Sequence, residues 1–101
     1  MPKIFEYSGI VFLFYSDDHL PVHVHAQYQQ YQNKLEFIYD NGEFVELKIK
    51  KVKGNEVLPT AKLAEAVSFC KAYQKQILVK WNDFFILKKK IKTEKITKKI
   101  K

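Results

Sequence analysis

Only one cysteine, Cys70, occurs among the 101 residues of this sequence, so no internal disulfide can form. A lone thiol is typical of reducing compartments, and we therefore expect a cytoplasmic protein that folds around a hydrophobic core. Hydrophobic residues make up 47% of the chain and aromatic residues 15%. This composition excludes intrinsic disorder over most of the length.

No apolar run is long enough to cross a membrane. The longest, residues 9–15, is far shorter than the roughly 20 residues that a transmembrane helix needs. No small-residue cleavage site follows it, so we expect neither a signal peptide nor a membrane partner. A buried β-strand explains the run better.

Arginine is absent, so all 18 basic residues are lysines. The net charge of +7 lies in residues 88–101, which hold eight Lys and one Glu, whereas residues 1–87 hold ten of each sign. Because guanidinium groups are the favoured partners of phosphates and guanine edges, the body is not predicted to read nucleic acid. The tail is a candidate tether to RNA or DNA. Its candidate contacts are Lys88, Lys89, Lys90 and Lys92.

Glycine and proline are scarce, at three residues each, so the few that occur mark turns clearly. Four segments have the apolar or alternating pattern of β-strands: residues 9–16, 22–28, 33–39 and 43–50. Asp40-Asn41-Gly42 predicts a tight hairpin turn before the last of them. Together the segments predict a four-stranded antiparallel meander.

The first predicted strand, residues 9–16, is apolar on both faces and is expected to be central. Helices should cover one of these faces. The exposed apolar side should then be the interface with a partner protein.

Helical spacing replaces strand spacing in the second half of the chain. Pro59 is predicted to open a helix, because proline suits the first helical turn. One face of this helix is apolar: Leu63, Val67 and Cys70. The spacing resumes over residues 77–85 after a break, so either one bent helix or two short helices fit.

These elements predict an α+β domain over residues 1–87, with the helices packed on one face of the meander. Residues 88–101 form a separate lysine-rich tail. Its isoleucines match neither the strand period nor the helix period. A disordered arm, a frayed helix and an extended edge strand therefore stay open for the tail.

All three histidines lie within seven positions, in the stretch DDHLPVHVHAQY. His23 and His25 alternate along a predicted strand, so they point to the same side with Cβ atoms roughly 6–7 Å apart. His19 precedes the proline and could fold back onto the pair. The three are candidate ligands of a divalent metal such as zinc, with Asp17 or Asp18 as a carboxylate.

Two other roles for the histidines stay open. His23 and His25 could act as a catalytic general acid and base, for example in phosphodiester cleavage, because imidazole titrates near neutral pH. In a purely structural role, the histidines would pair with Asp17, Asp18 and backbone carbonyls to hold the hairpin.

The histidine stretch resembles the signature Asp-His-x-Pro-Pro-His-x-His-x-x-Tyr of a family of small bacterial proteins catalogued as a domain of unknown function. Six residues match it directly: Asp18, His19, Pro21, His23, His25 and Tyr28. Val22 replaces the second proline, and Gln29-Gln30 stands where glycine commonly follows the tyrosine. The resemblance covers about residues 1–85 and includes Leu58-Pro59 and Trp81.

The resemblance implies a protein partner. Members of the family are often encoded beside an antitoxin-like domain, which implies a toxin-antitoxin-like pair and a small cognate protein encoded nearby. We therefore expect a binding module rather than an enzyme, and a homo-oligomer is a further expectation. The expected ligand or partner contacts are Asp18, His19, His23, His25 and Tyr28. The alternatives are a hydrolase or ribonuclease that uses the histidines, and nucleic-acid binding through the tail.

Overall fold

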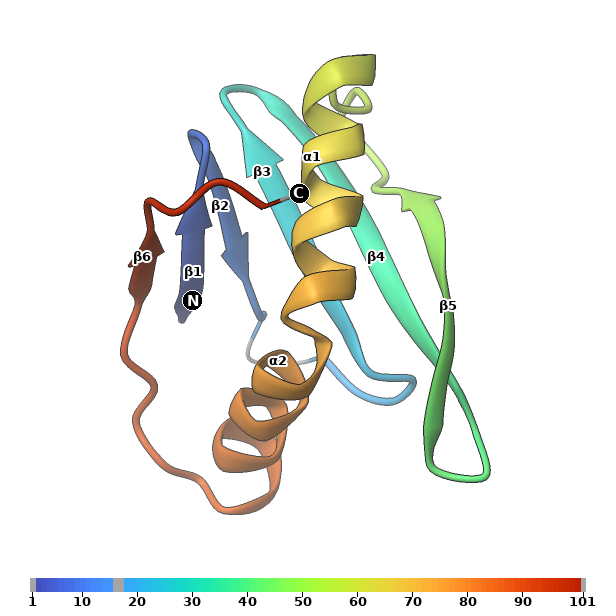
Figure 1. Ribbon diagram of the computed structural model, residues 1–101, viewed down its shortest axis with the longest axis vertical. Helices are drawn as coiled ribbons and strands as arrows, with labels where there is room; N and C mark the ends of the chain where they lie inside the picture. Colours follow the sequence, from blue (N-terminus) through green and yellow to red (C-terminus); the bar gives the residue numbers. More distant parts are fainter. Residues whose placement is uncertain (1, 16–17, 101) are drawn as a thin grey trace.

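The computed structural model describes residues 2–15 and 18–100. Within these residues, six strands form one sheet and two helices cover one of its faces (Figure 1). The strands are β1 (Lys3–Tyr7), β2 (Ile10–Leu13), β3 (His23–Tyr28), β4 (Tyr31–Asp40), β5 (Glu43–Lys51) and β6 (Glu94–Ile96). The helices are α1 (Thr60–Ala72) and α2 (Gln74–Trp81), and a single π-helical turn, η1 (Asn82–Ile86), extends α2.

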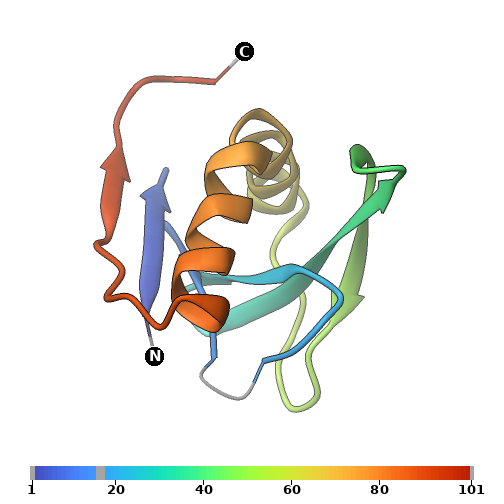
Figure 2. The ribbon, with the colours of Figure 1, turned by 90° about the horizontal axis from the view of Figure 1, so that it is seen from below.

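The strands lie in the order β5-β4-β3-β2-β1-β6. β1 to β5 pair antiparallel with their neighbours in the chain, whereas β6 pairs parallel with β1. Figure 2 shows the sheet curling around the helices, with β6 and β5 at its two ends. No helix in the described ranges is long and apolar enough to span a bilayer.

The α+β class is confirmed, but the prediction of four strands is wrong because the sheet has two more. β1 was missed because adjacent residues Ile4 and Phe5 are both buried and the pairing with β2 is irregular there, which hides the period of two. Ser8 and Gly9 connect β1 to β2 with φ angles of 53° and 77°. This Ser-Gly pair is a hairpin signal that could have revealed β1.

The C-terminal tail is docked on the sheet and supplies its sixth strand. β6 pairs with β1, and Ile91, Ile96 and Ile100 pack against the core. Lys80 of α2 forms an ion pair with Glu94 at 2.8 Å. Of the three conformations left open for the tail, the extended edge strand is the one found at residues 94–96.

Two separate helices are present rather than one bent helix, because α1 ends at Ala72 and α2 begins at Gln74. They cover the sheet through aromatic contacts. Phe69 of α1 stacks on Phe12 with ring centroids 4.6 Å apart, and Phe14 meets Trp81 edge-on at 5.3 Å. Trp81 is thus a core residue, as its spacing predicted.

Cys70 is completely buried on α1. Burial raises the pKa of its thiol far above the usual range, because a thiolate is poorly solvated in the core. Cys70 therefore acts as a small apolar core residue.

The central strand offers no apolar face to a partner. β2 lies between β1 and β3, and Ile10, Phe12 and Leu13 are each at most 2% exposed. The expected interface on this strand is therefore wrong, and exposed apolar side chains must be sought elsewhere.

Gln29→Gly should stabilise the fold. Gln29 lies in the turn between β3 and β4 with φ 54°, in the left-handed region that favours glycine. Relief of about 1–2 kcal/mol of strain exceeds the added chain entropy of about 0.4–1 kcal/mol, so the free energy of unfolding should rise by about 0.5–1 kcal/mol. Urea unfolding measures it. Gln30→Gly is the control and should destabilise, since Gln30 lacks a positive φ; equal effects would contradict the strain argument.

Candidate functional site

A side chain–backbone turn places Asp18 after β2. The Asp18 Oδ2 atom accepts a hydrogen bond from the Tyr15 amide at 2.8 Å, and the Asp18 amide donates to the Tyr15 carbonyl at 3.0 Å. Short polar side chains such as Asp commonly form turns of this kind. The turn holds the carboxylate against the start of β3.

Asp18, His23 and His25 converge, and we call them the Asp18–His23–His25 cluster. The Asp18 Oδ1 atom lies 3.1 Å from Nε2 of His23 and 3.6 Å from Nε2 of His25. One ligand atom from each residue lies within 4.8 Å of the others. His23 and His25 are 6% and 7% exposed, so the polar atoms of the cluster are largely removed from solvent.

The contacts of His23 determine which of its nitrogens carries the proton. Nδ1 of His23 lies 2.8 Å from the Pro21 carbonyl oxygen, which can only accept a hydrogen bond, so Nδ1 is the donor. In a neutral ring Nε2 then presents a lone pair to the Asp18 carboxylate. Two acceptors face each other at 3.1 Å, which requires a proton or a cation between them. A backbone carbonyl that fixes Nδ1–H is also the usual arrangement behind a metal-binding histidine.

His25 has no hydrogen-bond partner for either ring nitrogen within the described part of the chain, although both are buried. Its ring packs edge-on against Tyr15 at 4.3 Å and against His23 at 5.3 Å between centroids. Burial lowers the pKa of His25 below its ordinary value, and the nearby Asp18 carboxylate offsets only part of this effect. The Asp18 oxygen 3.6 Å from Nε2 and the Gln32 side chain are its nearest polar neighbours, and a buried imidazole without a full hydrogen bond costs stability unless something else binds it.

The cluster fits a transition-metal ion. Ligands about 2.0–2.1 Å from a tetrahedral zinc lie about 3.3–3.4 Å from one another. The two oxygen–nitrogen distances of 3.1 and 3.6 Å lie on either side of that separation, whereas the three ligand atoms as a set lie within 4.8 Å, so binding would draw them closer together. A pocket of about 210 Å³ opens beside the cluster, so a water or substrate atom has room at a further coordination position.

Glu36 lines the same pocket and was missed by the sequence analysis. It lies opposite His23 in the register of β3 and β4, is 8% exposed, and pairs with Lys34 at 3.4 Å and Lys50 at 3.5 Å. Its place opposite His23 follows from the two-residue turn at Gln29-Gln30, because turn length fixes which residues pair across a hairpin, but glutamines do not announce a turn in the sequence.

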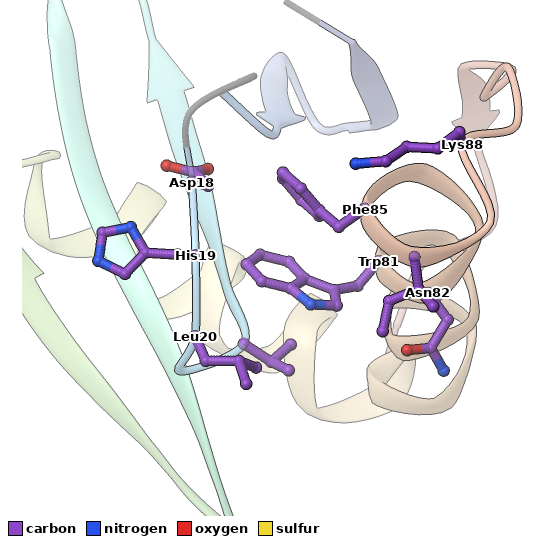
Figure 3. Close-up of a pocket in the computed structure, with 9 residues that line it drawn as sticks. Asp18, His19, Leu20, Trp81, Asn82, Phe85 and Lys88 are labelled. Atoms are coloured by element: carbon purple, nitrogen blue, oxygen red, sulfur yellow. The ribbon is translucent and has the colours of Figure 1, made fainter.

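The other predicted contact residues lie outside the cluster. His19 is exposed, and Figure 3 shows its ring on the opposite side of the loop from Trp81. Tyr28 lies at the far end of β3, with the Lys62 amine 5.0 Å from its ring. Asp17 is outside the described residues. Of the carboxylate and the third histidine expected beside the pair, the structure thus brings Asp18 into the cluster and leaves His19 outside it.

A second, larger pocket adjoins the cluster. It has a volume of about 650 Å³ and shares Asp18, His19 and Leu20 with the smaller pocket. Its other lining residues are Val22, Trp81, Asn82, Phe85, Ile86 and Lys88 (Figure 3). The Trp81 ring lies 5.3 Å from the His23 ring, so the wall of this pocket contacts the cluster directly. Of the tail lysines predicted to bind nucleic acid, Lys88 lies here.

Lowering the pH should destabilise the metal-free protein through His25. Because its folded pKa lies below the ordinary 6.5, the unfolded chain binds a proton that the folded chain does not, so the free energy of unfolding falls as the pH drops through 6.5. Urea unfolding in chelator between about pH 8 and about pH 5 measures this. His25→Gln does not titrate there, so an unchanged pH dependence in this variant would contradict the assignment.

Comparison with curated proteins and with solved structures gave no match. Residues 9–82 match the family described as Domain of unknown function (DUF4160). The matched segment runs from β2 to the end of α2 and includes the whole Asp18–His23–His25 cluster. The match confirms the predicted resemblance to a small domain-of-unknown-function family. The chain belongs to the DUF4160 family.

Proposed function

We propose that the protein is a metal-dependent hydrolase in which the Asp18–His23–His25 cluster holds a divalent ion such as zinc. The observation that carries the proposal is the buried His25 ring, which has no hydrogen-bond partner in the described residues and lies beside a carboxylate. A structural role accounts for His23, which binds Pro21 and Asp18. For His25 such a role offers only the Asp18 oxygen, 3.6 Å from Nε2 and beyond hydrogen-bond distance, and the nearby Gln32 side chain.

The geometry favours a bound ion over acid–base catalysis by the histidines alone. Nε2 of His23 and Nε2 of His25 both face the same Asp18 oxygen. A general acid or base must instead direct its nitrogen toward the substrate. Three protein ligands with an open position are the usual arrangement of a catalytic zinc.

The residues around the cluster suit an anionic ester, and we propose a phosphate ester as substrate. Lys34 lines the pocket and is paired with Glu36, but Lys50 pairs with the same carboxylate, so the three groups together keep a net positive charge for a phosphate. A zinc ion held by Asp18, His23 and His25 would supply a water that ionises near neutral pH. Glu36, which lines the same pocket, would accept the proton that the water loses on attack at phosphorus. The leaving oxygen would take a proton from solvent as its bond to phosphorus breaks.

Zinc should bind the wild-type protein and raise its melting temperature. Elemental analysis, calorimetry and thermal unfolding measure this. His23→Ala, His25→Ala and the isosteric Asp18→Asn should each weaken zinc binding by more than about 100-fold, since even partners of metal ligands contribute 10–100-fold. His19→Ala is the matched control and should keep the affinity, because His19 lies outside the cluster. Unchanged zinc affinity in folded His25→Gln and Asp18→Asn would overturn the proposal.

Hydrolysis is tested separately with bis(p-nitrophenyl) phosphate and the zinc-loaded protein. Glu36→Gln should keep zinc but lower the rate about 100-fold or more, as expected for loss of a general base. Glu46→Gln on the exposed part of β5 is the control. A zinc-loaded wild-type protein without activity would refute hydrolysis of phosphodiesters while leaving the metal site intact.

A second candidate function is the partner-binding half of a toxin-antitoxin-like pair. The observation that favours it is β5, an edge strand of nine residues on which Val45 and Ile49 are 57% and 49% exposed. An open edge with apolar side chains accepts a strand from another chain. The proposed occupant is the small cognate protein encoded nearby.

Co-expression with that cognate protein tests the partner candidate. A complex should form on co-purification and should be lost in the double variant Val45→Lys/Ile49→Lys. Val79→Lys on α2 is the control, because Val79 is as exposed as Val45. A monomer in size-exclusion chromatography with no co-purifying protein would overturn it, and self-association sensitive to the same double variant would identify a homo-oligomer instead.

A further inference from the structure

We propose that the larger pocket binds a base of single-stranded nucleic acid, with the adjoining phosphate between Lys88 and the Asp18–His23–His25 cluster. This inference rests on the proposed function, because it names the class of phosphate ester that the site would take. It is carried by the walls of the pocket, the side chains exposed at its rim and the charge beside it.

The walls of the pocket are apolar and aromatic. Leu20 and Val22 come from the loop before β3, and Trp81 and Phe85 come from α2 and η1 on the other side (Figure 3). A volume of about 650 Å³ is within the usual range of small-ligand sites. Such walls suit a flat ring, and aromatic surfaces stack with any base without sequence preference.

The rim of the pocket is unusually apolar for a surface. Leu20 is 71% exposed and Ile86 is 67% exposed, although both line the pocket. The π-helical turn η1 carries Phe85 and Ile86, and single π turns occur frequently at functional sites. Exposed apolar groups around a formed pocket indicate a ligand that covers them.

The charge beside the pocket indicates an anionic ligand. Lys88 lines the pocket, and Figure 3 shows its amine extending over Phe85 toward the loop that carries Asp18. Lys89 lies with Lys88 against Phe84 and Phe85 in a neighbouring hollow of about 200 Å³. Glu94 is the one acidic residue of the tail, and it is paired with Lys80. Within the described residues no ion pair of Lys88 or Lys89 is found, and Asp18 is the acidic residue that lines the pocket with Lys88.

The pocket and the cluster form one continuous site. Asp18, His19 and Leu20 line both hollows, and Trp81 contacts His23. A base held against Phe85 would thus leave its phosphate within reach of both Lys88 and the cluster. This combination of a ring-binding wall with cations along the backbone path is how single strands are bound without sequence readout.

Fluorescence anisotropy with labelled six-nucleotide RNA and DNA strands, and with a duplex of the same length, tests the inference. Chelator is present, so the test needs no metal and no cleavage. Both single strands should bind, with affinity falling as salt rises, and the duplex should bind more weakly because its bases are stacked inside. A preference between RNA and DNA would identify the physiological strand.

Two matched pairs of variants locate the binding. Leu20→Ala/Ile86→Ala should weaken binding about tenfold, whereas Val45→Ala/Val79→Ala should not, although its residues are similarly exposed. Lys88→Glu should weaken binding more than Lys98→Glu, which makes the same charge change outside the pocket. Substitution is preferable to deletion of the tail, because Ile91, Ile96 and Ile100 pack on the core.

Several outcomes would overturn the inference. Equal loss in Lys88→Glu and Lys98→Glu would mean that the tail acts only as an electrostatic tether. Unchanged oligonucleotide affinity in Leu20→Ala/Ile86→Ala, with loss of a co-purified protein, would mean that the pocket docks a partner. Zinc affinity separates this result from the proposed function, since the pocket variants should keep zinc and the cluster variants should not.

Discussion

The carboxylate of Asp18 links the loop after β2 to the two histidines of β3. Burying a carboxylate and two imidazoles removes them from water, and the free-energy cost is offset only if each polar atom finds a partner. His23 meets this requirement through Pro21 and Asp18, whereas His25 does not within the described residues. The proposed ion would neutralise the carboxylate and bind both rings at once. The two hydrogen bonds between Tyr15 and Asp18 hold the carboxylate in this position.

The two pockets would serve different purposes in the proposed active site: the smaller would hold the reacting phosphate and the larger would bind the rest of the substrate. The smaller one contains the polar groups, with Glu36 and Lys34 contributed by β4. The larger one is formed by the far side of the same loop against α2 and η1. Because the loop separates the two hollows, a change in its position would alter both together.

The sequence predicted the parts of the site that depend on local geometry. Strand alternation placed His23 and His25 side by side, and the Asn41-Gly42 turn and the break between the helices were found from local patterns. It could not choose between Asp17 and Asp18 as the carboxylate or show that His19 lies outside the cluster, because the path of a loop depends on its tertiary contacts. Glu36 was missed because the β3–β4 register depends on a turn made by two glutamines, which carry no turn signal of their own.

The two missed strands have a different cause. β6 consists of three residues, Glu-Lys-Ile, whose strand conformation depends on pairing with β1, about 90 residues earlier in the sequence. No local pattern can reveal a pairing of this kind. The parallel pairing also has a consequence for biosynthesis. β1 is synthesised well before β6, so the β1 edge of the sheet stays open, and prone to aggregation, until residues 94–96 have been made and pair with it.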